Sequence, residues 1–194
     1  MPSKTKGLQE LMIQELQDMY DAEKQLVRAL PKLAKAASDE ELGNAFREHL
    51  EVTKGHVERI ERVFESLDKR ARSKPCSGMK GIVEEGAKMI EEEDNESLLD
   101  AALAGGARKV EHYEMMAYES LRAMAQQLGL DEVAQLLEEN LQEEMQADQE
   151  LEQIGKRLIE TASEAGTEEA EGEEENARPS RTRTAAPAKT RTAR

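Results

Sequence analysis

Four segments of this chain carry an apolar residue every three or four positions, and acidic or histidine side chains interrupt each of these stripes. The spacing places each stripe on one face of a helix. Charged groups on a face that packs against other helices are costly unless they are paired or bind a metal ion. The interrupting residues are Glu23 in the first stripe, His49, Thr53 and His56 in the second, Glu111 and Glu114 in the third, and Glu144 and Asp148 in the fourth.

The interruptions fall at about the same depth along their helices. In each stripe one of them lies fifteen residues from one of two turn signals, Ser38 and Gly129. That separation is about 22 Å along a helix that rises 1.5 Å per residue. The residues at this distance are Glu23, Thr53, Glu114 and Glu144. A second set, about one helical turn further from the turn signals, consists of His56, Glu111 and Asp148. The common depth predicts one polar site inside a four-helix bundle.

The chemistry of such a site depends on how its charge is balanced. Several carboxylates at one level repel each other strongly without a counter-charge. Two divalent cations would supply that charge, and oxygen ligands with imidazole suit iron or manganese. The alternative is that each carboxylate lies at the edge of its stripe and reaches solvent, while Thr53 bonds its own i−4 carbonyl.

Caps and helix breakers delimit the elements that must position these residues. Ser38 with Glu41 reads as a capping box, Gly129 suits a helix C-terminus, and Asp131 can cap the helix after it. We therefore expect four long helices and one short one, at about 5–37, 38–68, 82–90, 96–128 and 131–160, with a connector at 69–81. The two short turns require antiparallel hairpins, and the long connection can cross the bundle as ferritin-like topologies require. The predicted fold is an all-α, ferritin-like four-helix bundle with a short extra helix.

The composition supports an all-helical protein. Of 194 residues, 36% are charged and only 3% are aromatic, with no Trp and five Pro. The chain has a single cysteine, Cys76, no apolar leader at its start and no apolar run of membrane-spanning length. These features predict a cytoplasmic protein with no membrane partner.

The net charge of −15 is concentrated in residues 1–160, whose acidic excess would repel nucleic acid and attract cations. Residues 161–194 contain seven Glu followed by six basic residues and no large apolar side chain. We expect the bundle to occupy 1–160 and the tail to be disordered. The basic end of the tail would allow weak, non-specific nucleic-acid contact.

Four stretches of sequence carry a resemblance to a known family. They are DMYDAEKQLVRALPKLAKAA (18–37), FREHLEVTKGHVERIERVFE (46–65), AGGARKVEHYEMMAYESL (104–121) and LLEENLQEEMQADQELEQIG (136–155). In these stretches the chain resembles the YciE/YciF-type ferritin-like proteins, over about residues 7–160. The resemblance implies a rubrerythrin-like bundle, a dimer interface at the short helix, and a ferroxidase-like role in a bacterial stress response.

The resemblance also implies metal ligands, position by position. Glu23, His56, Glu111, Glu114 and Glu144 match the ferritin-like pattern. Two positions depart from it. Thr53 stands where the second helix usually has Glu, and Ala147 stands where the fourth usually has His, with Asp148 one residue later. With His49 as a further ligand, we expect one or two iron or manganese ions per chain.

Two functions remain open from the sequence. The first is a di-metal carboxylate protein that oxidises Fe(II) with O₂ or peroxide, with Tyr20 and Tyr118 close to the ligands. The second is a metal-free or degenerate bundle that acts as a dimeric stress or interaction protein. In either case we expect a homodimer formed through the apolar face of residues 82–90.

Overall fold

The computed structural model describes the backbone of residues 7–177 and the side chains of residues 7–165. The helices are α1 (Leu8–Ala36), α2 (Glu40–Ser66), α3 (Ser77–Glu92), α4 (Glu96–Gln127) and α5 (Asp131–Ala177). Residues 7–177 contain no strand. The predicted all-α fold is confirmed.

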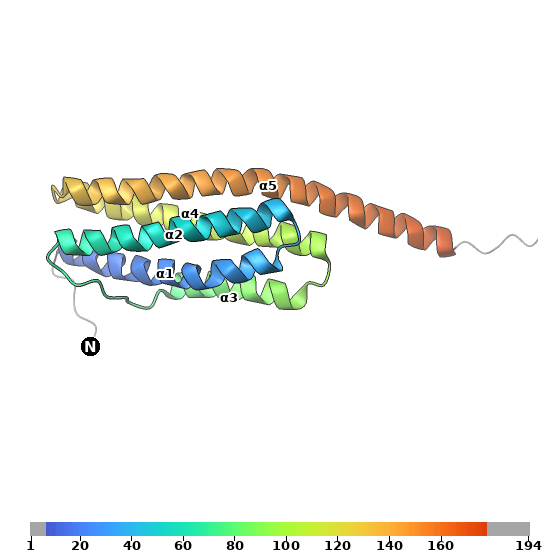
Figure 1. Ribbon diagram of the computed structural model, residues 1–194, viewed down its shortest axis with the longest axis horizontal. Coiled ribbons are helices and arrows are strands. Elements are labelled where there is room, and N and C mark those ends of the chain that lie inside the picture. The colour runs from blue at the N-terminus through green and yellow to red at the C-terminus, as the bar shows by residue number, and fades with distance from the viewer. Residues whose placement is uncertain (1–6, 178–194) are drawn as a thin grey trace, which may run out of the picture.

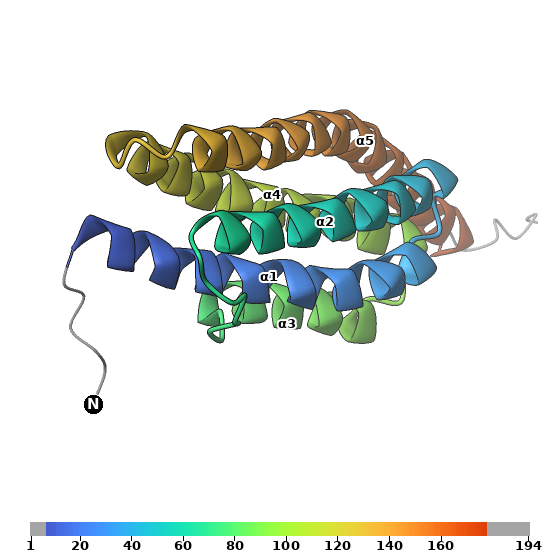
Figure 2. The same cartoon turned by 60° about the vertical axis from the view of Figure 1, so that its left-hand side comes forward.

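The four long helices form the bundle, and α3 lies outside it (Figure 1). Helices α1 and α2 are antiparallel, as are α4 and α5, and their short turns lie at opposite ends of the bundle. The connection from α2 runs beside α1, and α3 then carries the chain back to the far end, where α4 begins. Figure 2 shows α3 against α1, on the side away from α2. This is the crossing connection that the length of the 69–95 segment predicted.

The N-cap of α2 and a residue of α4 fix the α1–α2 turn. Asp39 is the N-cap of α2, and its side chain accepts a hydrogen bond from the Leu42 amide. The prediction that Ser38 caps this helix is therefore wrong. The carboxylate of Asp100, on α4, instead accepts the amides of Ser38 and Asp39 at 2.9 and 2.7 Å. Asp100 thus ties both residues of the turn to α4, and Asp39 rather than Ser38 supplies the capping side chain.

The α4–α5 turn follows the prediction from Gly129. This glycine has φ of +70°, which side chains with a Cβ rarely adopt. The amide of Gly129 bonds the Gln126 carbonyl at 3.1 Å, and the amide of Leu130 bonds the Ala125 carbonyl at 3.0 Å. These two bonds form a Schellman motif, which ends α4 and turns the chain sharply into α5.

Two helix boundaries differ from the prediction. Helix α3 begins at Ser77 rather than at residue 82, because Cys76 caps it and Gly78 lets it pack closely against Tyr113. Helix α5 does not end at about Glu160 but continues to Ala177, since Glu and Ala favour helix and no proline occurs between Asp131 and Ala177. Residues 178–194, with the basic end of the tail, lie outside the described residues. The division at residue 160 stays a prediction.

Part of the apolar face assigned to dimer formation is covered within the chain. Ile82, Val83 and Ile90 are half-buried and pack against the core of the bundle. The homodimer stays a prediction. Over residues 7–177, no helix combines the length and the apolar character of a membrane span.

Candidate metal centre

The middle of the bundle holds a set of buried polar side chains contributed by all four long helices. Glu23 lies on α1, His49 and His56 on α2, Glu111 and Glu114 on α4, and Glu144 on α5. Five of these six side chains are at most 2% exposed, and His49 is 11% exposed. A fixed rise per residue places these positions at one level, as the sequence predicted.

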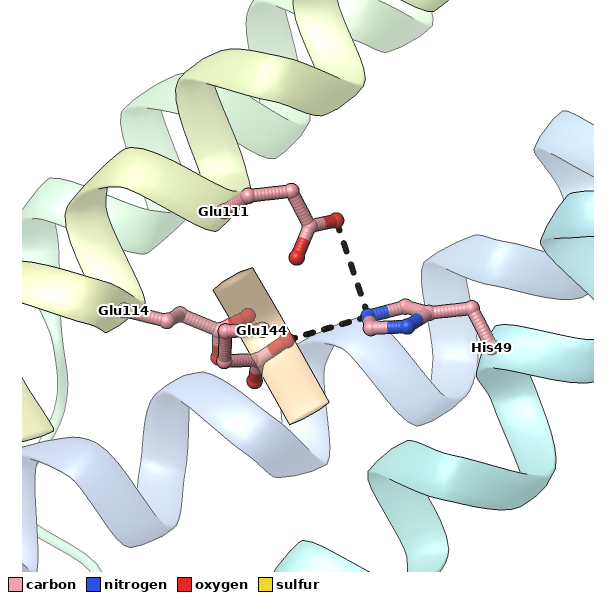
Figure 3. Close-up of side chains that lie close together, drawn as sticks. All are labelled: His49, Glu111, Glu114 and Glu144. Carbon is pink, nitrogen blue, oxygen red and sulfur yellow. Dashed lines mark ion pairs between the residues drawn. The ribbon is translucent and has the colours of Figure 1, made fainter. Parts of the chain in front are cut away.

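The first group of side chains consists of His49, Glu111, Glu114 and Glu144. Figure 3 shows them pointing toward one another; His49 comes from α2, Glu111 and Glu114 from α4, and Glu144 from α5. Nε2 of His49 lies 3.6 Å from Oε1 of Glu111 and 3.6 Å from Oε2 of Glu144. One ligand atom from each of the four side chains can be chosen so that all lie within 4.8 Å of one another. This spacing suits atoms that surround a single ion.

The second group consists of Glu23, His56 and Glu144. Nδ1 of His56 lies 3.4 Å from Oε1 of Glu23 and 3.0 Å from Oε1 of Glu144. Glu144 belongs to both groups, with one oxygen near each histidine. A carboxylate in that position can bridge two ions.

Most of the possible ligand atoms in both groups have no hydrogen-bond partner. Eight buried atoms of these residues accept or donate no hydrogen bond: Oε2 of Glu23, Nε2 of His49, Nδ1 of His56, Oε2 of Glu111, and both carboxylate oxygens of Glu114 and of Glu144. Although Nδ1 of His56 is close to Glu144, the two groups are not aligned for a hydrogen bond. Each unpartnered buried polar group costs about 1–3 kcal/mol. Divalent cations would satisfy these atoms, so the residues fit a metal site.

Burial and mutual repulsion shift the pKa values of the carboxyl groups of the centre. Burial, followed by neighbouring carboxylates, raises the pKa of Glu111 and of Glu114 well above the usual value. Burial also raises the pKa of Glu23, against the effect of His56. In Glu144 burial acts in the same direction, but His56 outweighs it and lowers the pKa.

The pKa values of the two histidines shift in opposite directions. Burial lowers the pKa of His49, which favours the neutral imidazole that binds metals. Burial also acts to lower the pKa of His56, but Glu23, Glu143 and Glu144 together raise it to about 12. Without a metal ion, the proton on His56 is therefore the main counter-charge to the carboxylates around it.

A hydrogen-bonded network supports the second group. Tyr118 donates to Oε1 of Glu23 and accepts from Nδ2 of Asn140 at 2.9 Å. Arg59 donates to Asn140 at 2.7 Å and to both oxygens of Glu143, one of which lies 2.9 Å from Nε2 of His56. The network fixes the ring of His56 with Nδ1 toward the interior, as carboxylate partners do for metal-binding histidines.

Sequence reasoning missed three members of this network, Arg59, Asn140 and Glu143. Asn140 is four residues before Glu144 on the same face of α5 and is fully buried. Its place in the fourth stripe was therefore a usable signal. Arg59 and Glu143 lie beside the stripes, and nothing in the spacing identifies them.

Three residues considered from the sequence lie outside both groups. Asp148 forms an ion pair with Arg108, with 2.7 Å between Oδ1 and Nε, and also approaches His112 at 3.2 Å. The hydroxyl of Thr53 donates to the His49 carbonyl at 2.8 Å, as expected for a threonine inside a helix. Tyr20 donates to Glu61 at 2.6 Å rather than to a residue of the centre.

Known proteins are similar to this chain in sequence and in fold. Residues 7–164 match the family described as Domain of unknown function (DUF892). The chain belongs to this family. It is 45% identical over 144 residues to Protein YciF of Escherichia coli (strain K12), which covers 74% of this chain and 87% of YciF.

Solved structures of YciF-like proteins have the same architecture. The crystal structure of the E. coli stress protein YciF matches with a TM-score of 0.77 and 42% identity, over 80% of this chain and 98% of that one. YcfI from Rhodopseudomonas palustris matches with a TM-score of 0.77 and 33% identity, over 78% of this chain and 97% of that one. The resemblance drawn from the sequence is confirmed.

In this DUF892 chain, a pocket of about 160 Å³ lies beside the first group, between α2 and α5. Its lining includes the ligand candidates His49 and Glu111, together with Ala147. The small side chain of Ala147, where the ferritin-like pattern usually has histidine, leaves this side of the centre open.

Proposed function

We propose that this chain binds two divalent metal ions, Fe(II) or Mn(II), and that it oxidises Fe(II) with O₂ or peroxide. The observation that carries the proposal is the set of eight buried ligand atoms without a hydrogen-bond partner. A bundle whose interior acids were only structural would pair these atoms with donors, as this chain does for Asp100 and Asp148.

The chain's own residues would hold the two ions at different positions. His49, Glu111 and Glu114 would ligate the outer ion, Glu23 and His56 the inner ion, and Glu144 both. Glu143 would keep the His56 ring oriented, and Tyr118 would hold one oxygen of Glu23. Fe(II) is here the substrate that supplies electrons to O₂ or peroxide, which needs a coordination position open to small molecules.

The position of the imidazoles separates this centre from the usual ferritin-like pattern. Both histidines come from α2, and Ala147 on α5 contributes no ligand. His49 would replace the missing α5 imidazole, because it lies within reach of Glu111 and Glu144. The outer ion would therefore still have a nitrogen ligand, although Thr53 and Ala147 stand at positions where the ferritin-like pattern usually has Glu and His.

A metal-free bundle is the second candidate, and one observation favours it. The raised pKa values of Glu111 and Glu114 would let these carboxyls remain neutral inside the bundle, while Glu144 pairs with His56. A stress-related interaction protein needs no more than that stable arrangement. The two candidates differ in whether metal binds with defined stoichiometry and whether Fe(II) turns over.

The test is anaerobic loading with Fe(II) followed by addition of O₂ or peroxide, with Fe(III) formation followed by absorbance. Wild type should oxidise Fe(II) faster than protein-free buffer, and Glu144→Gln should lose most of this acceleration. Asp148→Asn is the matched control, since Asp148 is a buried acid on the same helix but outside both groups. Oxidation no faster than in buffer would overturn the oxidase proposal, and absence of binding would favour the metal-free bundle.

A further inference from the structure

The pocket between α2 and α5 reaches only one of the two groups. Of the six ligand candidates, His49 and Glu111 line it, whereas Glu23, His56, Glu114 and Glu144 do not. Its volume of about 160 Å³ has room for several waters, since one water needs roughly 10–15 Å³. An ion that enters here would meet the first group before the second.

The lining of this pocket selects for positive charge. It contains three carboxylates apart from Glu111, namely Glu48, Glu143 and Glu150, and neither lysine nor arginine. Glu143 is engaged by Arg59 and His56. Glu48 and Glu150 are exposed, and neither pairs with a basic residue in the described part of the chain. Low-dielectric walls lined with one sign of charge raise the local concentration of the opposite ion.

An acidic trough continues outward from the pocket toward the α1–α2 turn. It shares Glu48 and Glu150 with the pocket and adds Asp39, Glu40 and Glu41. The guanidinium of Arg157, the single basic residue of its lining, is held 2.8 Å from both Asp39 and Glu41. The charge of Glu40, Glu48 and Glu150 therefore stays uncompensated along the path.

Unpartnered ligand atoms stand at the inner end of this acidic path. Glu111 is 2% exposed, lines the pocket, and has an oxygen without a hydrogen-bond partner. Nε2 of His49 is likewise unpartnered. We propose that the pocket is the port through which divalent cations reach the centre from solvent, and that Glu48 and Glu150 attract them. This inference rests on the proposed metal centre.

The port has a consequence for the oxidant. Anions such as superoxide would be repelled by the acidic lining, whereas uncharged O₂ and hydrogen peroxide would pass. The port would thus admit Fe(II) and a neutral oxidant to the same outer position.

Stopped-flow loading with Co(II), whose visible absorption changes on protein ligation, tests the port in the full chain. Glu48→Gln/Glu150→Gln should load several-fold more slowly than wild type at low salt. The rates should converge near 0.5 M salt, roughly where screening removes long-range attraction between charges. Glu58→Gln/Glu160→Gln is the matched control, because it removes the same charge from exposed sites on the same helices, away from the pocket. The control should load like wild type.

A second variant tests the route by shape. Ala147→Leu places a larger side chain in the pocket lining and should slow loading at every salt concentration, while the final Co(II) stoichiometry stays that of wild type. Wild-type rates in both Ala147→Leu and Glu48→Gln/Glu150→Gln would overturn the port and leave the metal centre standing. No saturable Co(II) binding in wild type would overturn the centre and the port together.

Discussion

Nε2 of His49 on α2 lies 3.6 Å from Oε2 of Glu144 on α5, inside the bundle. The other oxygen of Glu144 lies 3.0 Å from Nδ1 of His56, which is about two helical turns further along α2. Two histidines seven residues apart therefore flank one buried carboxylate. This arrangement is the basis of the two-ion proposal, and it makes Glu144 the residue on which both positions depend.

Removal of single ligands should separate the two positions. Wild type should bind two Mn(II) ions per chain, one for each group. His49→Gln should retain one, because its group loses the imidazole while the other is intact, and Glu23→Gln should also retain one. Glu144→Gln should bind at most weakly. Equilibrium titration followed by electron paramagnetic resonance of free Mn(II) gives these numbers, and equal loss in all three variants would contradict separate positions.

Without metal, the centre should destabilise the bundle. Both oxygens of Glu114 are buried and unpartnered. Glu114→Leu should therefore raise the free energy of unfolding of the metal-free protein by about 1–3 kcal/mol, since an apolar side chain removes the cost of an unpartnered buried polar group. The same variant should lose the stabilisation that Mn(II) gives to wild type. Urea unfolding with and without chelator measures both effects, and a destabilised metal-free variant would show that Glu114 has a structural role.

The depth of the site along the bundle could be predicted from the sequence because the rise per residue of a helix is constant. Counting fifteen residues from each turn placed Glu23, Glu114 and Glu144 together, and all three are fully buried. The same counting did not show that Asp148, one turn along the same face of α5, lies outside both groups. That side chain faces Arg108, and no periodicity reveals which residue of a neighbouring helix lies opposite.

Local signals predicted the turns unevenly for a related reason. Gly129 was found because a positive φ demands glycine, a purely local requirement. The cap of α2 was misassigned to Ser38 because Asp39, the next residue, is an equally good capping residue, and the sequence pattern does not decide between two adjacent candidates. The start of α3 was missed because Pro75 and Gly78 read as a loop, whereas the contact of Gly78 with Tyr113 is tertiary.

The α2 cap provides a direct test of that correction. Asp39→Ala should lower the free energy of unfolding by about 1–2 kcal/mol through loss of the cap, whereas Ser38→Ala should change it by less than about 0.5 kcal/mol. Thermal unfolding of the two variants at pH 7 distinguishes them. A larger effect at Ser38 would restore the original assignment.

The same residue predicts a pH dependence. Hydrogen bonds from Arg157, followed by smaller contributions, lower the pKa of Asp39 below its ordinary 3.8. A carboxyl with a lowered folded-state pKa stabilises the protein above the unfolded value, and this stability is lost as pH falls through the folded value. Asp39→Asn keeps a capping side chain but no charge. Its deficit relative to wild type should be present at pH 6 and fade below about pH 3.8, as measured by denaturant unfolding; a deficit independent of pH would contradict this.

Two glycines in α3 should respond oppositely to alanine. A Cβ at Gly78 would meet the Tyr113 ring at 2.8 Å, and Tyr113 is held by contacts with Cys76 and Asp18. Gly78→Ala should therefore cost about 1–3 kcal/mol through overpacking. A Cβ at Gly81 meets nothing within 4 Å, so Gly81→Ala should stabilise by about 0.5–1 kcal/mol. Denaturant unfolding measures both, and stabilisation by both would mean that Tyr113 moves freely.

The proposed function requires that the two buried groups bind metal ions side by side and share Glu144. A crystal structure of the Mn(II)-loaded protein, with anomalous data collected on either side of the manganese edge, tests it most directly. We expect one peak bounded by His49, Glu111, Glu114 and Glu144 and a second bounded by Glu23, His56 and Glu144. An interior without anomalous signal, with the same side chains paired to one another or to water, would contradict it.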